Sequence, residues 1–315
     1  MTISAKLAKK LDAKIWTVFS KVVSEMNYRL ELVKHIGQSP KLSTADRVLC
    51  EELKQKGIVI TSLDDFSLPS TPQFRKAVDE LLPQLKQASI EGNLSSNQRA
   101  AGSHCLYGDS VAIGQNFPAI YLWGLENRIL DILENYYGAP VACIGVNMRR
   151  DLADATQKGT KLWHLDGEDR KVIKVVVYLS DVDEDGGPFE YIPDHLSPSY
   201  RDFESSLILD EDMAKVVPSS EWEACTGPKG TVIIADNARF FHHGKTPLKD
   251  RYTLFYAYAY RQPKRPETCQ NSAWRKGLPF MKDKLSQRQR DSIWGYESLD
   301  MVENSEESAS RCSFP

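Results

Sequence analysis

The chain has 315 residues with a formal net charge of −3, and 41% of its residues are hydrophobic. Acidic and basic residues are mixed along the sequence, so no basic stripe predicts binding to nucleic acid. No run of about 18 apolar residues predicts a membrane span, and the first residues lack the apolar core of a secretory signal. The six cysteines are scattered and contain no C-x-x-C pair, which predicts free thiols in a reducing compartment. We therefore expect a cytoplasmic protein that is long enough to bury a sizeable core.

The first part of the chain predicts helices. Over residues 4–34, apolar side chains recur every three or four positions, as in an amphipathic helix, while lysines lie mainly on the other side. A mitochondrial transit peptide is an alternative interpretation that Asp12 and Glu25 disfavour. Further helices are predicted over residues 44–56, with Ser43 or Thr44 as its cap and Gly57 after its end, over 71–82 before Pro83, and over 118–137 between Pro118 and Gly138.

The later part of the chain predicts strands. Helices come first and strands afterwards without regular alternation, which favours a sandwich or barrel supported by helices over a doubly wound sheet. We expect a single domain over residues 1–300, and the polar stretch 89–103 is expected to be a loop, either over the site or at the surface. Strand-like runs cover residues 58–61, 141–148, 162–166, 172–179, 189–192, 231–235 and 252–260. The expected parts are 1–137 (mostly helical support), 138–261 (β core), 262–300 (an extension that packs through Trp274, Phe280 and Trp294) and 301–315 (a tail disordered by composition).

The central motif is a histidine and a carboxylate two residues apart, His164 and Asp166, shortly before the apolar run 172–179. Strand side chains alternate with a period of two, so both would project onto the same face. Such a pair is part of a metal site if a second histidine joins it. The downstream candidates are His242 and His243, and adjacent strand side chains point in opposite directions, so one of the two can reach a metal.

A basic residue and a hydroxyl follow on another strand-like run, at Arg251 and Thr253. Two histidines and one carboxylate bind one face of octahedral Fe(II) and leave three positions open. A 2-oxo acid can fill two of these positions, and dioxygen the third. The planar fork of Arg251 matches the far carboxylate of 2-oxoglutarate, and Thr253 lies on the same strand face and can add a hydroxyl.

Several of these features also have simpler interpretations. An isolated His-x-Asp pair at a strand end can be a plain hydrogen-bonded pair. His104 beside Cys105, and His195 after a turn, are interpreted as incidental loop residues, and Trp163 as a packing residue. The acidic run 181–185 is more typical of a solvated turn than of a second metal site.

Taken together and in this order, the motifs resemble the Fe(II)/2-oxoglutarate-dependent dioxygenases, and within them the phytanoyl-CoA hydroxylase-like group. The resemblance covers roughly residues 141–261, with a fainter likeness over 118–137. It implies an α+β protein with a mainly β core, a double-stranded β-helix (jelly roll, cupin-like) with buttressing N-terminal helices. The stretches that carry it are residues 162–166, 173–182, 186–193 and 235–244, followed by Arg251.

Carried over residue by residue, the resemblance implies that His164, Asp166 and His242 bind the iron and that Arg251 holds the distal carboxylate of 2-oxoglutarate. His242 is favoured because the group usually shows a ligand histidine, one residue, then glycine. The intervening residue, often arginine in the group, is His243 here, so His243 stays the alternative ligand. Further candidates for contacts to 2-oxoglutarate are Thr253, Lys174, Asn147 and Arg149, although a strand lysine more often faces solvent.

The resemblance implies hydroxylation of an unactivated C–H bond of a small or medium-sized metabolite by Fe(II), 2-oxoglutarate and O2, with release of succinate and CO2. Asp166 is present, whereas related halogenases lack this carboxylate. Desaturation, epimerisation and cyclisation share the opening step and stay alternatives. Rivals from other classes are a non-catalytic jelly-roll protein, which would have no reason to keep these separated polar residues, and a zinc hydrolase, which would not need Arg251. The sequence leaves the oligomeric state open.

Overall fold

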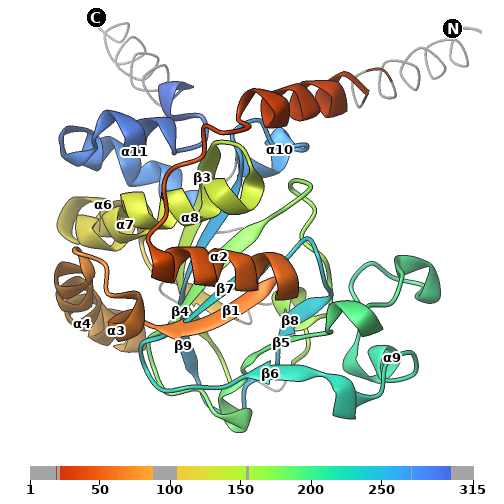
Figure 1. Cartoon of the computed structure of the whole chain (residues 1–315). Helices are drawn as coiled ribbons and strands as arrows, with labels where there is room; N and C mark the ends of the chain where they lie inside the picture. The colour runs from red at the N-terminus through yellow and green to blue at the C-terminus, as the bar shows by residue number, and fades with distance from the viewer. Residues whose placement is uncertain (1–18, 20–21, 88–104, 154–155, 271, 299–315) are drawn as a thin grey trace, which may run out of the picture.

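The computed structural model describes residues 19, 22–87, 105–153, 156–270 and 272–298. Helices gather on one side of a six-stranded antiparallel sheet, and a three-stranded antiparallel sheet lies across the other side (Figure 1). A mixed helical and antiparallel-sheet architecture agrees with the predicted fold class. The finer prediction of a double-stranded β-helix, and the predicted division of the chain, stay predictions.

The large sheet carries most of the strands that the sequence predicts. Its order is β1 (Ile58–Ser62), β7 (Thr231–Asp236), β4 (Ile173–Tyr178), β9 (Arg251–Tyr260), β3 (Val141–Asp151) and β2 (Cys105–Tyr107). The small sheet has the order β6 (Glu223–Cys225), β5 (Phe189–Tyr191) and β8 (His242–Gly244).

Most helices lie on one side of the large sheet (Figure 1). Residues 22–34 are helical, while residues 4–18, 20 and 21 of the predicted first helix lie outside the described part of the chain. The other α-helices are α2 (Thr44–Lys56), α3 (Leu63–Phe66), α4 (Thr71–Gln87), α6 (Ser110–Asn116), α7 (Pro118–Gly124), α8 (Asn127–Tyr137), α9 (Asp210–Met213), α10 (Pro266–Cys269) and α11 (Gln287–Asp291). Short 3-10 turns also occur, among them η1 (Gly159–Lys161) between β3 and β4.

The ends of α2 follow from local sequence, and this predicted helix is confirmed. The side chain of Ser43 accepts a hydrogen bond from the backbone N–H of Asp46, which satisfies a free donor of the first turn. Gly57 ends the helix at φ 75°, a left-handed conformation that glycine adopts without steric cost. A side chain at Gly57 would also collide with Arg239 and Phe240, because its Cβ would lie 2.9 Å from each.

The predicted end of the next helix at Pro83 is wrong, because α4 continues through Pro83 to Gln87. Proline removes the hydrogen bond to the carbonyl of Asp79, four residues earlier. Both Pro83 and Asp79 lie on the exposed side of the helix, where water can bind that carbonyl. Leu82 and Leu85 are buried on the other side, and this packing holds the last turn in place.

The single helix predicted over residues 118–137 is also wrong, because α7 and α8 are separate helices. The break follows Gly124, which lies so close to the ring of Tyr256 that a Cβ there would be 2.2 Å from it. Leu125 has φ −103° and ψ 15°, and Glu126 is extended with ψ 137°. Contact with the sheet therefore overrides an apolar pattern that runs through both helices.

The two faces of the large sheet have different surroundings. On β9, Leu254, Tyr256 and Tyr258 are fully buried in the core cluster formed with the helices. The alternate residues of the same strand, among them Arg251 and Thr253, line a cavity of about 160 Å³ on the opposite face. Because strand side chains alternate, one strand serves both the core and the cavity.

Other predictions have mixed outcomes. In the predicted extension, Trp274 is buried, Trp294 is half-buried and Phe280 is 46% exposed. Residues 89–103, His104 and the predicted tail lie outside the described residues. Within the described ranges, no helix combines the length and apolar character needed to cross a bilayer.

Candidate metal centre

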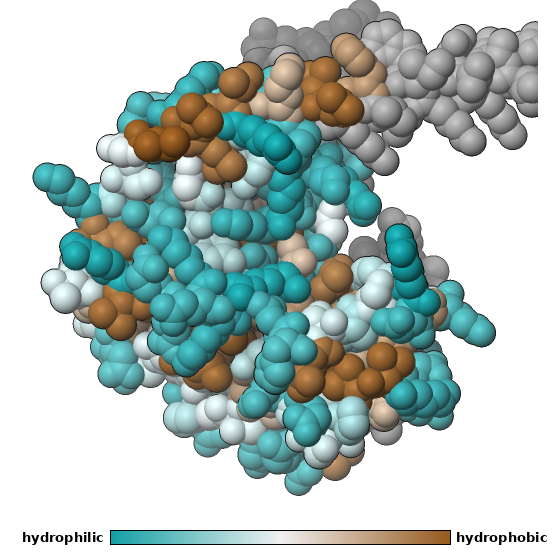
Figure 2. All heavy atoms as spheres, turned by 45° about the vertical axis from the view of Figure 1, so that its right-hand side comes forward, coloured by the Kyte–Doolittle hydropathy of each residue, from teal (hydrophilic) through white to brown (hydrophobic). Residues whose placement is uncertain are grey.

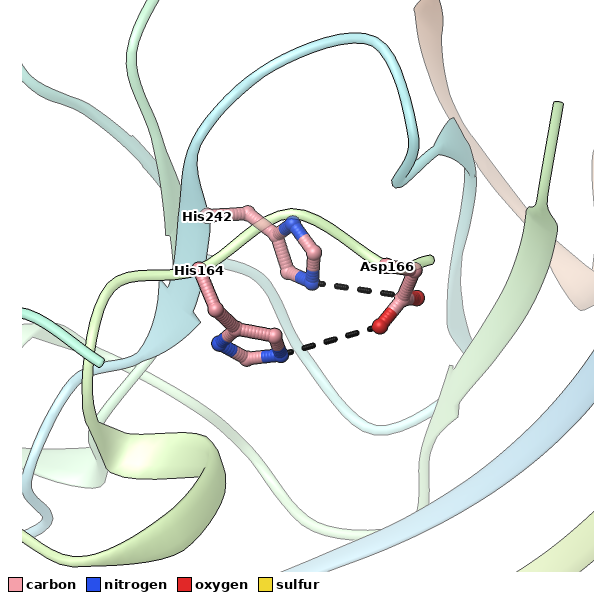
Figure 3. Close-up of side chains that lie close together, drawn as sticks. All are labelled: His164, Asp166 and His242. Carbon is pink, nitrogen blue, oxygen red and sulfur yellow. Dashed lines mark ion pairs between the residues drawn. The ribbon is translucent and has the colours of Figure 1, made fainter. Parts of the chain in front are cut away.

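Three of the predicted side chains come together at the cavity. The potential ligand atoms of His164, Asp166 and His242 all lie within 4.8 Å of one another. Nε2 of His164 is 3.7 Å from Oδ1 of Asp166, and Nε2 of His242 is 4.0 Å from its Oδ2. Figure 3 shows both imidazoles directed at the carboxylate. Two histidines and one carboxylate form a donor set that suits a divalent first-row metal with open positions.

Backbone hydrogen bonds hold these residues in register. The predicted strand over residues 162–166 is wrong, since this segment forms isolated bridges instead of a ladder. One bridge joins the two histidines: His164 N donates to His242 O at 3.1 Å, and His242 N donates to His164 O at 3.0 Å. Asp166 N donates to the carbonyl of Asn237 at 2.9 Å. These bonds tie the segment to β8 and to the turn that precedes it, so both ends of the donor set are fixed.

The orientation of the imidazoles is set by carbonyl groups two residues earlier in the chain. Nδ1 of His164 lies 2.7 Å from the oxygen of Leu162, and Nδ1 of His242 lies 3.3 Å from the oxygen of Phe240. A carbonyl oxygen can only accept, so each Nδ1 carries the proton and each Nε2 presents a lone pair. Burial lowers the pKa of both histidines, that of His242 well below 6.5, and this favours the neutral ring that binds a metal.

Asp166 is the charged member of the set. Burial raises the pKa of its carboxyl, but the positive charge of Lys174 and the electrostatic interactions with His242 and His164 outweigh burial and lower the pKa to about 2. Nζ of Lys174 lies 2.6 Å from Oδ2 of Asp166. Lys174 therefore does not face solvent alone, as a strand lysine usually does; it lines the cavity and pairs with the carboxylate.

His243 occupies a different environment from its neighbour His242. Its Nε2 lies 2.8 Å from Oε2 of Glu190, and its Nδ1 lies 3.0 Å from the carbonyl oxygen of Lys161. The ring also stacks on Trp163 with a centroid separation of 3.8 Å. Both nitrogens are thus engaged with oxygen atoms, and the structure brings His242, but not His243, into the donor set.

A second part of the cavity wall is cationic. Nη2 and Nε of Arg251 lie 2.9 and 3.0 Å from Oδ2 of Asp151, and Nη1 also donates to the carbonyl of Gly187. Nε of Arg149 lies 3.1 Å from Oδ1 of the same aspartate. One carboxylate therefore serves two guanidinium groups, and these three side chains carry a net positive charge. Such a wall is complementary to an anion, because a buried charge is costly without a counter-charge.

The remaining predicted residues line the same cavity. The hydroxyl of Thr253 is buried and has no hydrogen-bond partner among the described residues. The strand register places these residues side by side. Arg149 of β3 pairs with Thr253 of β9, and Thr253 pairs with Tyr178 of β4. Asn147 lies two residues before Arg149 on β3 and therefore on the same face, and it also lines the cavity.

Two residues of this site, Asp151 and Asn237, were not predicted from the sequence. Asp151 follows Arg149 at i+2, so strand alternation could have placed both on one face. Asn237 lies in the turn before His242, and its Nδ2 is 2.8 Å from Nε2 of that histidine. Its Oδ1 is buried without a partner among the described residues. The sequence signal for Asn237 is its position as a polar residue directly after the apolar run that forms β7.

Comparisons with known proteins give matches in solved structures. No family model matches the chain, and no curated protein sequence matches it. The crystal structure of EctD from S. alaskensis with 2-oxoglutarate and 5-hydroxyectoine is 20% identical, covers 70% of this chain and 77% of its own, and has a TM-score of 0.46. The epimerase SnoN, in complex with Fe3+, alpha ketoglutarate and nogalamycin RO, is 16% identical, covers 69% of this chain and 84% of its own, and has a TM-score of 0.45.

HygX from Streptomyces hygroscopicus, with nickel and 2-oxoglutarate bound, is 14% identical, covers 70% of this chain and 88% of its own, and has a TM-score of 0.43. Iron and 2-oxoglutarate, the groups that the sequence resemblance implies, are thus bound in structures to which this chain is similar. At these TM-scores the chemistry of the present site has to follow from its own atoms.

Proposed function

We propose that this chain is an Fe(II)- and 2-oxoglutarate-dependent oxygenase of the phytanoyl-CoA hydroxylase-like group. Its reaction would be hydroxylation of an unactivated C–H bond of a small or medium-sized metabolite, with release of succinate and CO2. The observation that carries the proposal is a single cavity that combines the His164, Asp166 and His242 donor set with the net-positive wall around Arg251. The proposal extends to the fold, as a double-stranded β-helix built from the two facing sheets.

The side chains present fit both groups. Two neutral imidazoles and one ionised carboxylate match the ligands that ferrous iron takes in such enzymes. The Nε2 lone pair of His242 accepts from Nδ2 of Asn237, so this amide would have to move aside for a metal. The unpartnered hydroxyl of Thr253 and the guanidinium of Arg251 match a carboxylate that needs a donor and a counter-charge. A hydrolytic zinc site would use the same three ligands but would leave this wall without a purpose.

When bound, iron would activate dioxygen at the expense of 2-oxoglutarate, which leaves as succinate and CO2. The residues of this chain hold that chemistry in place. The Nδ1 bonds of His164 and His242 fix the two rings, and Lys174 restrains one oxygen of Asp166. Arg251, braced by Asp151, would orient the distal carboxylate of 2-oxoglutarate. Positioning of this kind accelerates a reaction because the reacting groups need not find each other by diffusion.

The apolar part of the cavity wall would limit access of water once the cofactors are bound. Val176, Phe189 and Phe255 form apolar parts of its lining, next to the polar groups that would bind the cofactors. Exclusion of water strengthens the electrostatic interactions of the site and suppresses side reactions of a strong oxidant. The lining therefore suits an oxidation at carbon better than a hydrolysis.

Anaerobic spectroscopy tests the proposal. Ferrous protein mixed with 2-oxoglutarate without oxygen is expected to show a metal-to-ligand charge-transfer band in the visible region. The band should vanish in the double variant His164→Ala/Asp166→Ala and persist in His195→Ala, which removes an exposed histidine away from the donor set. Absence of the band from the wild-type protein, or its persistence in the double variant, overturns the proposed function.

A succinate-release screen against a metabolite library addresses the substrate and the outcome. Turnover above the uncoupled background identifies the substrate class. A product heavier by one oxygen atom supports hydroxylation, whereas loss of two hydrogens, or an isomer of the substrate, replaces it with desaturation or epimerisation.

A further inference from the structure

The helix of residues 22–34 is attached to the body through one of its sides. Tyr28 is 9% exposed and packs edge-on against Tyr260, with ring centroids 5.3 Å apart. The guanidinium of Arg170 lies 4.4 Å from the centre of the Tyr28 ring, and its Nε is 2.7 Å from Oε2 of Glu25. These contacts fix how the helix is rotated, and therefore which side faces away from the protein.

The side that faces away is apolar. Five exposed apolar residues lie within about 80° of one another around the helix axis and roughly opposite Tyr28, because successive helical residues are about 100° apart. Figure 2 shows brown, hydrophobic residues gathered along the top of the molecule, where this helix lies. A continuous apolar stripe of this kind marks a surface for interaction. We call it the outer stripe: Phe19, Val22, Met26, Leu30 and Val33, which are 58%, 61%, 54%, 50% and 64% exposed.

The outer stripe is symmetric about Met26. Val22 and Leu30 lie four positions before and after Met26, and Phe19 and Val33 lie seven positions before and after it. When two such helices pack antiparallel about a two-fold axis, Met26 meets Met26, Val22 meets Leu30, and Phe19 meets Val33. An interface between identical chains requires a patch that is complementary to itself, and this spacing provides one.

The same arrangement brings opposite charges together. Arg29 and Glu25 lie on the same flank of the outer stripe, three residues after and one residue before Met26. The two-fold axis would place Arg29 of one copy about 3 Å, measured along the helix axis, from Glu25 of the other. Both side chains reach solvent, with 77% and 44% of their surface exposed. Their attraction across the interface favours the antiparallel over the parallel orientation.

We propose that the outer stripe is the interface of a homodimer, in which two copies pair their helices antiparallel about a two-fold axis through Met26. A single helix pair lies at the low end of stable interface areas, and we expect a weak dimer with a dissociation constant on the order of micromolar. The interface uses no residue of the candidate metal centre.

Other occupants fit the outer stripe less well. Apart from Phe314, the large apolar residues of the tail 299–315 fall within residues 299–302, a segment of about 13 Å when extended, whereas the stripe is about 21 Å long. Helices that bind membrane surfaces usually carry an excess of lysine and arginine on the polar side. Within residues 22–34, Arg29 pairs with Glu25, and Lys34 with Glu31, so this described stretch presents balanced charge.

Sedimentation velocity over roughly 1 to 100 µM full-length protein tests the dimer. The wild-type protein should shift from monomer to dimer over this range. Met26→Glu places two like charges on the axis and should raise the dissociation constant at least tenfold. Val48→Glu is the matched control, because Val48 is 65% exposed on α2, away from the outer stripe. A monomeric wild-type protein, or equal weakening by both substitutions, overturns the proposal.

Cysteine cross-linking tests the orientation, in a Cys312→Ser background that retains the buried native thiols. A disulfide requires Cα atoms about 4.4–6.8 Å apart, so it reports which positions meet. Met26→Cys should cross-link to itself, and a mixture of Val22→Cys and Leu30→Cys protein should form the mixed dimer. Efficient self-cross-linking of Val22→Cys would show a parallel pair and overturn the proposal. Recruitment of monomer to phosphatidylcholine/phosphatidylserine vesicles without dimerisation would overturn it in favour of a membrane surface.

Discussion

Both faces of β9 contain fully buried side chains but have different tasks. Leu254 and Tyr256 on the helix side are 0% exposed, and Arg251 and Thr253 on the cavity side are 2% and 0% exposed. The hydroxyl of Tyr256 donates to the carbonyl of Ile120 at 2.6 Å, so its polar atom is satisfied within the core. On the cavity side, the hydroxyl of Thr253 has no partner among the described residues. Burial therefore does not separate core from site; unmatched polar groups and net charge do.

The largest expected effect comes from the helix side. Tyr256→Ala removes a ring packed against Trp123, with centroids 5.4 Å apart, and leaves a cavity in the core. The free energy of unfolding should fall by about 3–5 kcal/mol. Urea unfolding followed by circular dichroism measures this. The dissociation constant for 2-oxoglutarate should be unchanged in the folded protein, and a large change in that constant would remove the distinction between the two faces.

On the cavity side, Arg251→Gln should weaken binding of 2-oxoglutarate by about 2–3 kcal/mol, or roughly 30- to 150-fold, because a charged donor is lost. Anaerobic calorimetric titration with ferrous protein measures this effect. Arg150→Gln is the matched control, since Arg150 lies next to Arg149 on β3, points to the other face and pairs with Asp250. Equal weakening by both variants would argue against a specific anchor at Arg251.

The small sheet contains a buried polar pair, Glu190 and His243, that lies outside the donor set. Burial raises the pKa of Glu190, but the hydrogen bond from His243 and nearby positive charges outweigh this and keep the pKa below its ordinary value of 4.5. A carboxyl whose pKa is lower in the folded state stabilises the protein above the unfolded pKa and loses this contribution as the pH falls through the folded pKa. Glu190→Gln should therefore cost about 1–2 kcal/mol at pH 7.

The difference in unfolding free energy between wild type and Glu190→Gln should shrink as the pH falls below 4.5. Urea unfolding of both proteins at several pH values measures it. A difference that stays constant with pH would show that the contact contributes by packing alone.

The smallest effect is expected at Thr253, and it has opposite signs for stability and binding. Thr253→Val keeps the shape of the side chain but removes a buried hydroxyl that has no partner in the described structure, so the protein should be as stable or slightly more stable. Loss of the hydroxyl should weaken 2-oxoglutarate binding by about 0.5–1.5 kcal/mol. Thermal unfolding and calorimetric titration on the same sample give both values. A loss of stability without a change in binding would show that Thr253 contributes to core packing and not to binding of 2-oxoglutarate.

The sequence by itself determined features that depend on a few neighbouring residues. The caps of α2 and the shared face of Arg251 and Thr253 follow from local geometry, because a cap depends on a few adjacent residues and strand side chains alternate in direction. The order of strands after helices likewise indicated a β core with helical support.

The tertiary structure decided what depends on distant partners. It brought His242 to the donor set while Glu190 and Trp163 engaged His243, and it placed Asp151 between two guanidinium groups. It also broke the long helix at Gly124 against the ring of Tyr256. Even the outer stripe, which the sequence predicts as an apolar side, was left exposed because the opposite side docks on the body. A local sequence pattern predicts which side chains share a face, but the residues that cover that face are far away in the chain.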